Sequence, residues 1–126
     1  MTLHFLGNVP GSRLAGLVQG LRVAVEAFPL EFGTGEVWPN GVAVLLPREQ
    51  PAALMRLHSG LGKALRQLQL PVDDRPYRPH VTLARRSRGA VRPSAQAELR
   101  WHVSGGYVLA RSLPGGTGYE ILHRFS

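Results

Sequence analysis

An imidazole and a hydroxyl lie two residues apart in the segment of residues 78–85, which reads Arg-Pro-His-Val-Thr-Leu-Ala-Arg. Side chains alternate along an extended segment, so His80 and Thr82 share one face, while Val81 and Leu83 share the other and would pack on a core. A histidine can move protons near neutral pH, and a neighbouring hydroxyl can donate a hydrogen bond to a phosphoryl oxygen. The pattern therefore indicates acid–base chemistry on a phosphate ester.

A weaker echo of this pattern opens the chain at residues 2–7, Thr-Leu-His-Phe-Leu-Gly. This segment also reads as extended, which places Thr2 and His4 on one face, toward the site. Together the two segments resemble the motifs of the two-histidine (2H) phosphoesterases, and within them the RNA 2′,3′-cyclic phosphodiesterases, also called 2′–5′ RNA ligases. Members carry two His-x-Thr motifs. Residues 78–85 match the second throughout, and residues 2–7 match the first from its Thr onward.

The resemblance implies an α+β fold of two pseudo-symmetric lobes, with antiparallel sheets around a central cleft and helices on the outside. Residues 1–126 would form a single domain. The family's first catalytic histidine falls one residue before Met1, and its opening strand and helix have no counterpart here. We expect that the start was assigned too late, because the chain begins inside a predicted strand. The other interpretation is a truncated or degenerate copy.

The activity that the resemblance implies is metal-free hydrolysis of an RNA 2′,3′-cyclic phosphate to a 2′-phosphate. ATP-independent 2′–5′ ligation, in which an RNA 5′-hydroxyl attacks instead of water, would be a second activity. One histidine removes a proton from the attacking water and the other protonates the departing ribose oxygen, and His80 is one of the two. Thr82 and Thr2 would hydrogen-bond the non-bridging oxygens. Arg85 would help to hold the cyclic phosphate, and Phe5 would stack on a base.

Each of these residues also has a purely structural interpretation. A lone strand histidine is usually structural, Thr is common in strands, and an Arg is usually solvated at the surface. For His80 the flanking arginines and the whole-motif match favour catalysis. His4 is not expected to replace the absent histidine, because four residues of strand separate the two positions by about 13 Å. The remaining histidines, predicted to be surface or structural residues, are His58, His102 and His123.

The sequence predicts neither a metal nor a nucleotide cofactor. No set of histidines and carboxylates has metal-ligand spacing, and no glycine-rich loop follows a predicted strand and opens a helix. The absence of cysteine excludes disulfides, thiol catalysis and cysteine-based zinc sites.

The net charge of +7, with 15 basic residues of which all but Lys63 are arginine, favours a polyanionic partner. An arginine-rich proteome encoded by a GC-rich genome is the alternative. Six arginines cluster in sequence around His80: Arg75, Arg78, Arg85, Arg86, Arg88 and Arg92. The expected partners are RNA with 2′,3′-cyclic phosphate ends or small 2′,3′-cyclic nucleotides. No membrane segment or signal peptide is recognisable, so we expect a cytoplasmic protein, monomeric if its N-terminus is complete.

Hydrophobic periodicity predicts the elements that would position these residues. Helices are expected from Ser12 to about Phe28 and from Pro51 to Leu68. Two predicted hairpins join residues 30–38 to 42–46 and 101–113 to 119–125, and a polar connection over 87–97 follows the His80 strand. Two other functions compete with the enzyme. The chain could be a one-histidine relic that binds RNA ends without turnover, or a basic module whose His-x-Thr is coincidental.

Overall fold

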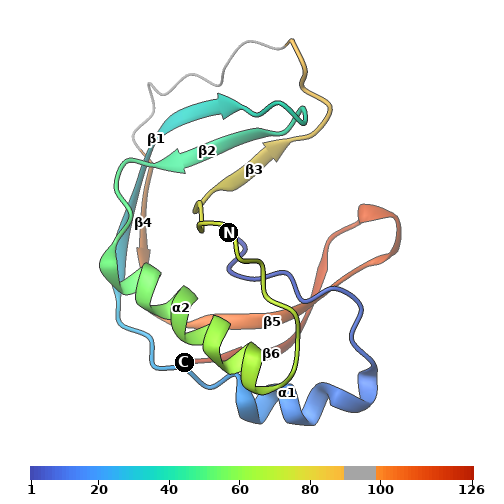
Figure 1. Ribbon diagram of the computed structural model, residues 1–126. Helices are drawn as coiled ribbons and strands as arrows, with labels where there is room; N and C mark the ends of the chain where they lie inside the picture. Colours follow the sequence, from blue (N-terminus) through green and yellow to red (C-terminus); the bar gives the residue numbers. More distant parts are fainter. Residues whose placement is uncertain (90–98) are drawn as a thin grey trace.

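The computed structural model describes residues 1–89 and 99–126, in which two antiparallel sheets lie beside two helices (Figure 1). The larger sheet has the strand order β3-β2-β1-β4, and the smaller one pairs β5 with β6. The strands are β1 (Phe28–Val37), β2 (Ala43–Pro47), β3 (Val81–Ala84), β4 (Leu99–Val103), β5 (Tyr107–Ser112) and β6 (Tyr119–Phe125). The helices are α1 (Leu14–Gly20) and α2 (Ala52–Gln67), with single 3₁₀ turns at Gly11–Arg13 and Pro114–Gly116. The predicted α+β class with antiparallel sheets is confirmed.

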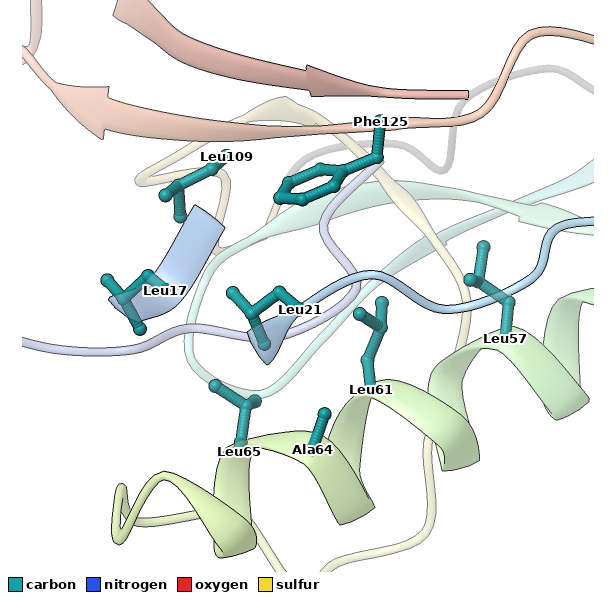
Figure 2. Packing of buried hydrophobic residues seen from close by; sticks show 8 residues of the cluster. All are labelled: Leu17, Leu21, Leu57, Leu61, Ala64, Leu65, Leu109 and Phe125. Carbon is teal, nitrogen blue, oxygen red and sulfur yellow. The ribbon is translucent and has the colours of Figure 1, made fainter. Parts of the chain in front are cut away.

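Helix α2 forms as predicted, and its leucine stripe packs against both sheets. Leu54 packs in one buried cluster with Phe28, Leu30 and Phe32 of β1. Further along the same face, α2 enters a second buried cluster with α1 and the β5–β6 hairpin (Figure 2), whose members are Leu17, Leu21, Leu57, Leu61, Ala64, Leu65, Leu109 and Phe125. Helix α2 therefore contributes side chains to both buried clusters. Apolar side chains of residues 3–9 and 68–72 pack against the second cluster.

The hairpin predicted at Pro39-Asn40-Gly41 is confirmed. β1 and β2 pair in antiparallel register, with Glu36 opposite Val44. Trp38 N–H donates to Val42 O at 2.9 Å, and Gly41 has the positive φ of +82° that such a turn requires. A local signal sufficed here because the turn residues themselves determine the conformation.

The first helix is shorter than predicted, ending at Gly20 rather than near Phe28. The Tyr107 hydroxyl takes over the next backbone groups: it accepts a hydrogen bond from Val23 N–H at 2.7 Å and lies 2.6 Å from Leu21 O, to which it donates. Tyr107, more than eighty residues away, thus bonds backbone groups that would otherwise continue the helix. Val23 and Val25 fit the apolar spacing of a helix but lie outside it.

The strand predicted over residues 101–113 is two strands in different sheets. β4 pairs with β1, and β5 pairs with β6. The chain changes sheets at Gly106, whose φ is +103°, and a Cβ at this position would lie 1.9 Å from the carbonyl oxygen of Phe125. Only glycine fits this crossing. The predicted connection over 87–97 lies largely outside the described residues.

The opening segment is not a strand, which corrects the prediction of a strand over residues 2–7. Residues 1–10 join no ladder in the described part of the chain. Instead, Leu3, Leu6 and Val9 pack against the second cluster, so side-chain contacts rather than backbone pairing hold the segment. No helix among residues 1–89 and 99–126 is long and apolar enough to cross a membrane.

Candidate active site

His80 lies immediately before β3 and is half-buried. Its Nδ1 is 2.7 Å from the carbonyl oxygen of Arg78. A carbonyl oxygen can only accept, so Nδ1 carries a proton, and in the neutral ring Nε2 has the lone pair. The intervening Pro79 is fully buried and has a ring-fixed φ, which keeps the Arg78 carbonyl in place.

Three residues beside His80 contact one another, and we call them the Trp38 clamp: Glu36, Trp38 and Arg78. The centroids of the Trp38 and His80 rings are 4.6 Å apart at an interplanar angle of 60°. The indole N–H donates to Glu36 Oε2 at 3.0 Å. The Arg78 guanidinium carbon lies 5.0 Å from the Trp38 ring centroid, and its Nη2 is 3.6 Å from Glu36 Oε2. Glu36 and Trp38 were not predicted as site residues, because no local sequence pattern shows that the end of β1 meets His80.

Thr82 lies on the same face as the clamp. It is opposite Val44 in the register of β3 with β2, and Val44 is opposite Glu36 in the register of β2 with β1. Residues opposite each other in a ladder share a face, so Glu36 and Thr82 belong to one surface of the sheet. The neighbouring Val81 is opposite Leu45 and packs with the first core cluster, as predicted for the apolar face.

β3 contains a β-bulge that changes the direction of the residues after Thr82. Thr82 is opposite Val44 and Ala84 is opposite Ala43, so Leu83 is an extra residue in the ladder. Leu83 is 51% exposed, which corrects the prediction that it packs on the core. An inserted residue reverses the alternation, so Ala84 faces the side of Ala43. Arg85 follows the last residue of β3 and lies in a bend, where the chain leaves the sheet.

The side chains of the first motif do not share one face. Thr2 is exposed and Phe5 is 84% exposed. His4 does not share the Thr2 face, as had been expected, but is turned toward α2. Its ring stacks on His58 at a centroid distance of 4.0 Å, and its Nε2 donates to His58 O at 2.8 Å. Because the segment is not a strand, the alternation on which the expectation rested does not apply.

Tyr77 connects the first motif to the second. Its ring stacks on His58 at 3.9 Å and 8°, and its hydroxyl donates to Thr2 O at 2.9 Å. Figure 1 shows the N-terminus beside the segment that leads into β3. Burial raises the pKa of Tyr77 to about 12, so the hydroxyl stays a donor at neutral pH. Burial and, secondarily, the charge of His4 lower the pKa of His58 to about 4, so this ring is neutral.

The arginines around His80 form two groups. Arg75 pairs with Asp73 at 2.6 Å, a contact that lowers the pKa of Asp73 to about 2, and Arg78 pairs with Glu36. The second group follows β3 and is exposed: Arg85, Arg86 and Arg88. No carboxylate of residues 1–89 or 99–126 lies within ion-pair distance of these three. Arg92 lies outside the described residues.

Potential metal ligands do not gather anywhere in the described part of the chain: no three side chains of His, Asp or Glu come together there. The surface around His80 combines an imidazole whose Nδ1 bonds the Arg78 carbonyl, a hydroxyl from Thr82 and the exposed guanidinium groups that follow β3.

The chain is similar in sequence to known proteins. Residues 1–112 match the family model of the 2′-5′ RNA ligase superfamily. An RNA 2′,3′-cyclic phosphodiesterase of Thermus thermophilus is 34% identical over 148 aligned positions, which cover the whole of this chain and 70% of the relative. A protein of the same name from Geobacillus stearothermophilus is 31% identical over 96 positions, covering 71% of this chain and 30% of the relative.

The fold is similar to solved structures as well. The crystal structure of E. coli LigT in complex with 3′-AMP superposes with a TM-score of 0.83 at 25% identity, covering 98% of this chain and 74% of LigT.

Proposed function

The chain belongs to the 2′-5′ RNA ligase superfamily, and from that membership we propose that it is an RNA 2′,3′-cyclic phosphodiesterase that opens the cyclic phosphate to a 2′-phosphate. The observation that supports this most is the state of His80. Its proton is on Nδ1, held by the Arg78 carbonyl, and the lone pair on Nε2 is available to a substrate.

Hydrolysis needs two proton transfers. A water oxygen attacks phosphorus and loses a proton to a base, while the bond from phosphorus to the ribose 3′-oxygen breaks and that oxygen takes a proton from an acid. His80 Nε2 fills one of these roles. In the direction of ligation an RNA 5′-hydroxyl replaces water, and opening of the cyclic phosphate supplies the driving force without ATP.

The threonine hydroxyls would stabilise the charge that develops on the phosphoryl oxygens. Thr82 shares the face of His80, and a neutral donor there can bind a non-bridging oxygen without ionising. Thr2, in the first motif, would act in the same way. The hydrogen bond from the Tyr77 hydroxyl to its carbonyl oxygen attaches Thr2 to the segment that leads to His80. Neither side chain would exchange a proton with the substrate.

The substrate would be RNA with a 2′,3′-cyclic end, or a small 2′,3′-cyclic nucleotide. The related LigT has been solved with 3′-AMP and with phosphate. Arg85 would contact the cyclic phosphate, and Arg86 and Arg88 would attract the remaining phosphates. Phe5, with an exposed ring, would stack on a base. With such a substrate, the enzyme would act in the cytoplasm.

The test is turnover of an RNA with a 2′,3′-cyclic end in EDTA, followed by phosphorus NMR. We expect a 2′-phosphate product, and a loss of about 10²–10⁴ in kcat for His80→Ala, because a general acid–base group is removed. His102→Ala is the matched control, since His102 is an exposed histidine on β4. Equal turnover by His80→Ala and the unmodified protein would overturn the proposal, and binding of the cyclic end without turnover would support the relic instead.

A further inference from the structure

We propose that Trp38, held by Glu36, is a positioning residue for His80. It would keep the imidazole in the one orientation in which Nδ1 donates to Arg78 and Nε2 faces the substrate. This inference rests on the proposed function of His80 and adds two residues, neither of which carries a proton in the reaction.

One hydrogen bond does not by itself fix an imidazole ring. The bond from Nδ1 to the Arg78 carbonyl determines where one ring atom lies, but rotation of the ring about Cα–Cβ or Cβ–Cγ breaks this bond and leaves Nδ1 without the acceptor that selects its tautomer. The indole of Trp38 packs against the imidazole at 4.6 Å and 60°, so a rotation of the ring would lose this contact as well as the hydrogen bond. The two contacts together favour one rotamer and, through the carbonyl acceptor, one tautomer.

Glu36 holds the indole and Arg78 at once. Its Oε2 accepts from the indole N–H at 3.0 Å and lies 3.6 Å from Arg78 Nη2. Arg78 is therefore held at both ends, since its carbonyl accepts from His80 and its guanidinium lies against Trp38 and Glu36. The Glu36 side chain is 34% exposed, so this carboxylate is partly withdrawn from solvent.

The arrangement argues against Trp38 as a platform for a nucleobase. A stacking platform needs an open ring face, as the exposed Phe5 has. Trp38 is half-buried, with the Arg78 guanidinium over its ring and the His80 imidazole beside it. A positioning role predicts a loss in kcat, whereas a platform predicts a rise in KM.

The first measurement is the tautomer of His80, from two-dimensional NMR of the full chain labelled with ¹⁵N-histidine. We expect the Nδ1–H tautomer in the unmodified protein and in Trp38→Phe, which keeps a ring at this position. Trp38→Ala should show a mixture with the Nε2–H tautomer, and so should Glu36→Ala, which removes the acceptor that holds both the indole N–H and the Arg78 guanidinium. Trp101→Ala is the matched control, because Trp101 is a half-exposed tryptophan on β4. Unchanged His80 signals in Trp38→Ala would overturn the inference.

Kinetics on the same variants separate the inference from the proposed function. We expect Trp38→Ala to lower kcat about 10–100-fold with little change in KM, because a misplaced catalytic group slows the chemical step. Trp38→Phe should recover most of this loss. A rise in KM alone would overturn the positioning role. Failure of the proposed function would instead appear as a His80→Ala protein with unimpaired turnover, whatever the tautomer of His80.

Discussion

The hydroxyl of Tyr77 donates to the carbonyl oxygen of Thr2 at 2.9 Å, across 75 residues of chain. Tyr77 lies three residues before His80, so this bond fixes the first motif to the approach of the second. Behind it, the Tyr77 ring stacks on His58 of α2, and His58 stacks on His4. The opening segment thus owes its place to a column of three rings rather than to a strand ladder.

Replacing Tyr77 by Phe should loosen this attachment while keeping the ring stack. We expect the free energy of unfolding to fall by about 1 kcal/mol, the usual net contribution of one intramolecular hydrogen bond. Hydrogen exchange at residues 2–6 should quicken. Tyr119→Phe is the control, since Tyr119 is 71% exposed. Identical exchange at residues 2–6 in both variants would show that the Tyr77 hydroxyl does not hold this segment.

Stability should fall in mild acid because of His58. Its pKa is about 4 in the folded protein and 6.5 in the unfolded chain. Between these values the unfolded state binds more protons, so the free energy of unfolding decreases as the pH falls from 6.5 toward 4, and this group contributes no slope above 6.5. Urea denaturation at several pH values measures the slope. His58→Phe should flatten it, whereas His102→Asn should not, and equal slopes in the two variants would remove His58 as the cause.

The β-bulge at Leu83 can be tested by exchanging two neighbouring residues. In the bulged register Ala84 lies on the side opposite Thr82, and we expect Arg85, directly after it, to reach the substrate from the Thr82 side. The double variant Ala84→Arg, Arg85→Ala should therefore lose about 10²-fold in kcat/KM, as much as Arg85→Ala alone, because one donor to the phosphate is gone. In a regular strand the exchanged arginine would share the His80 face. Recovery of activity in the double variant would thus refute the bulge.

Removing a side chain from the interface of α2 should cost more than removing an exposed one of the same type. Leu61 is 6% exposed in the second cluster. Leu61→Ala should lower the free energy of unfolding by about 2–5 kcal/mol through lost burial and a residual cavity. Leu83→Ala, at an exposed position, is the matched comparison. Urea denaturation compares them, and a cost for Leu83→Ala equal to that for Leu61→Ala would contradict the assigned burial.

Local sequence patterns predicted the elements whose conformation depends on neighbouring residues. The Asn40-Gly41 turn and the leucine stripe of α2 are examples, and both formed as expected. The placement of Thr82 and Val81 on opposite faces followed from simple alternation. These features needed no partner from elsewhere in the chain.

The features that the sequence did not predict each depend on a distant residue. Tyr107 ends the first helix, and the backbone of Phe125 makes Gly106 the crossing between sheets. The bulge at Leu83 is visible only in the register with β2. The contact of Trp38 with His80 joins the end of one strand to the start of another that follows about forty residues later, which periodicity cannot show.

Helix α2 links the two buried clusters within a single turn, since Leu54 belongs to one and Leu57 to the other. Each buried cluster packs on a different sheet, so both sheets use the same helix as part of their core. Loss of α2 would remove packing from the two sheets at once, and we expect them to unfold together with the helix.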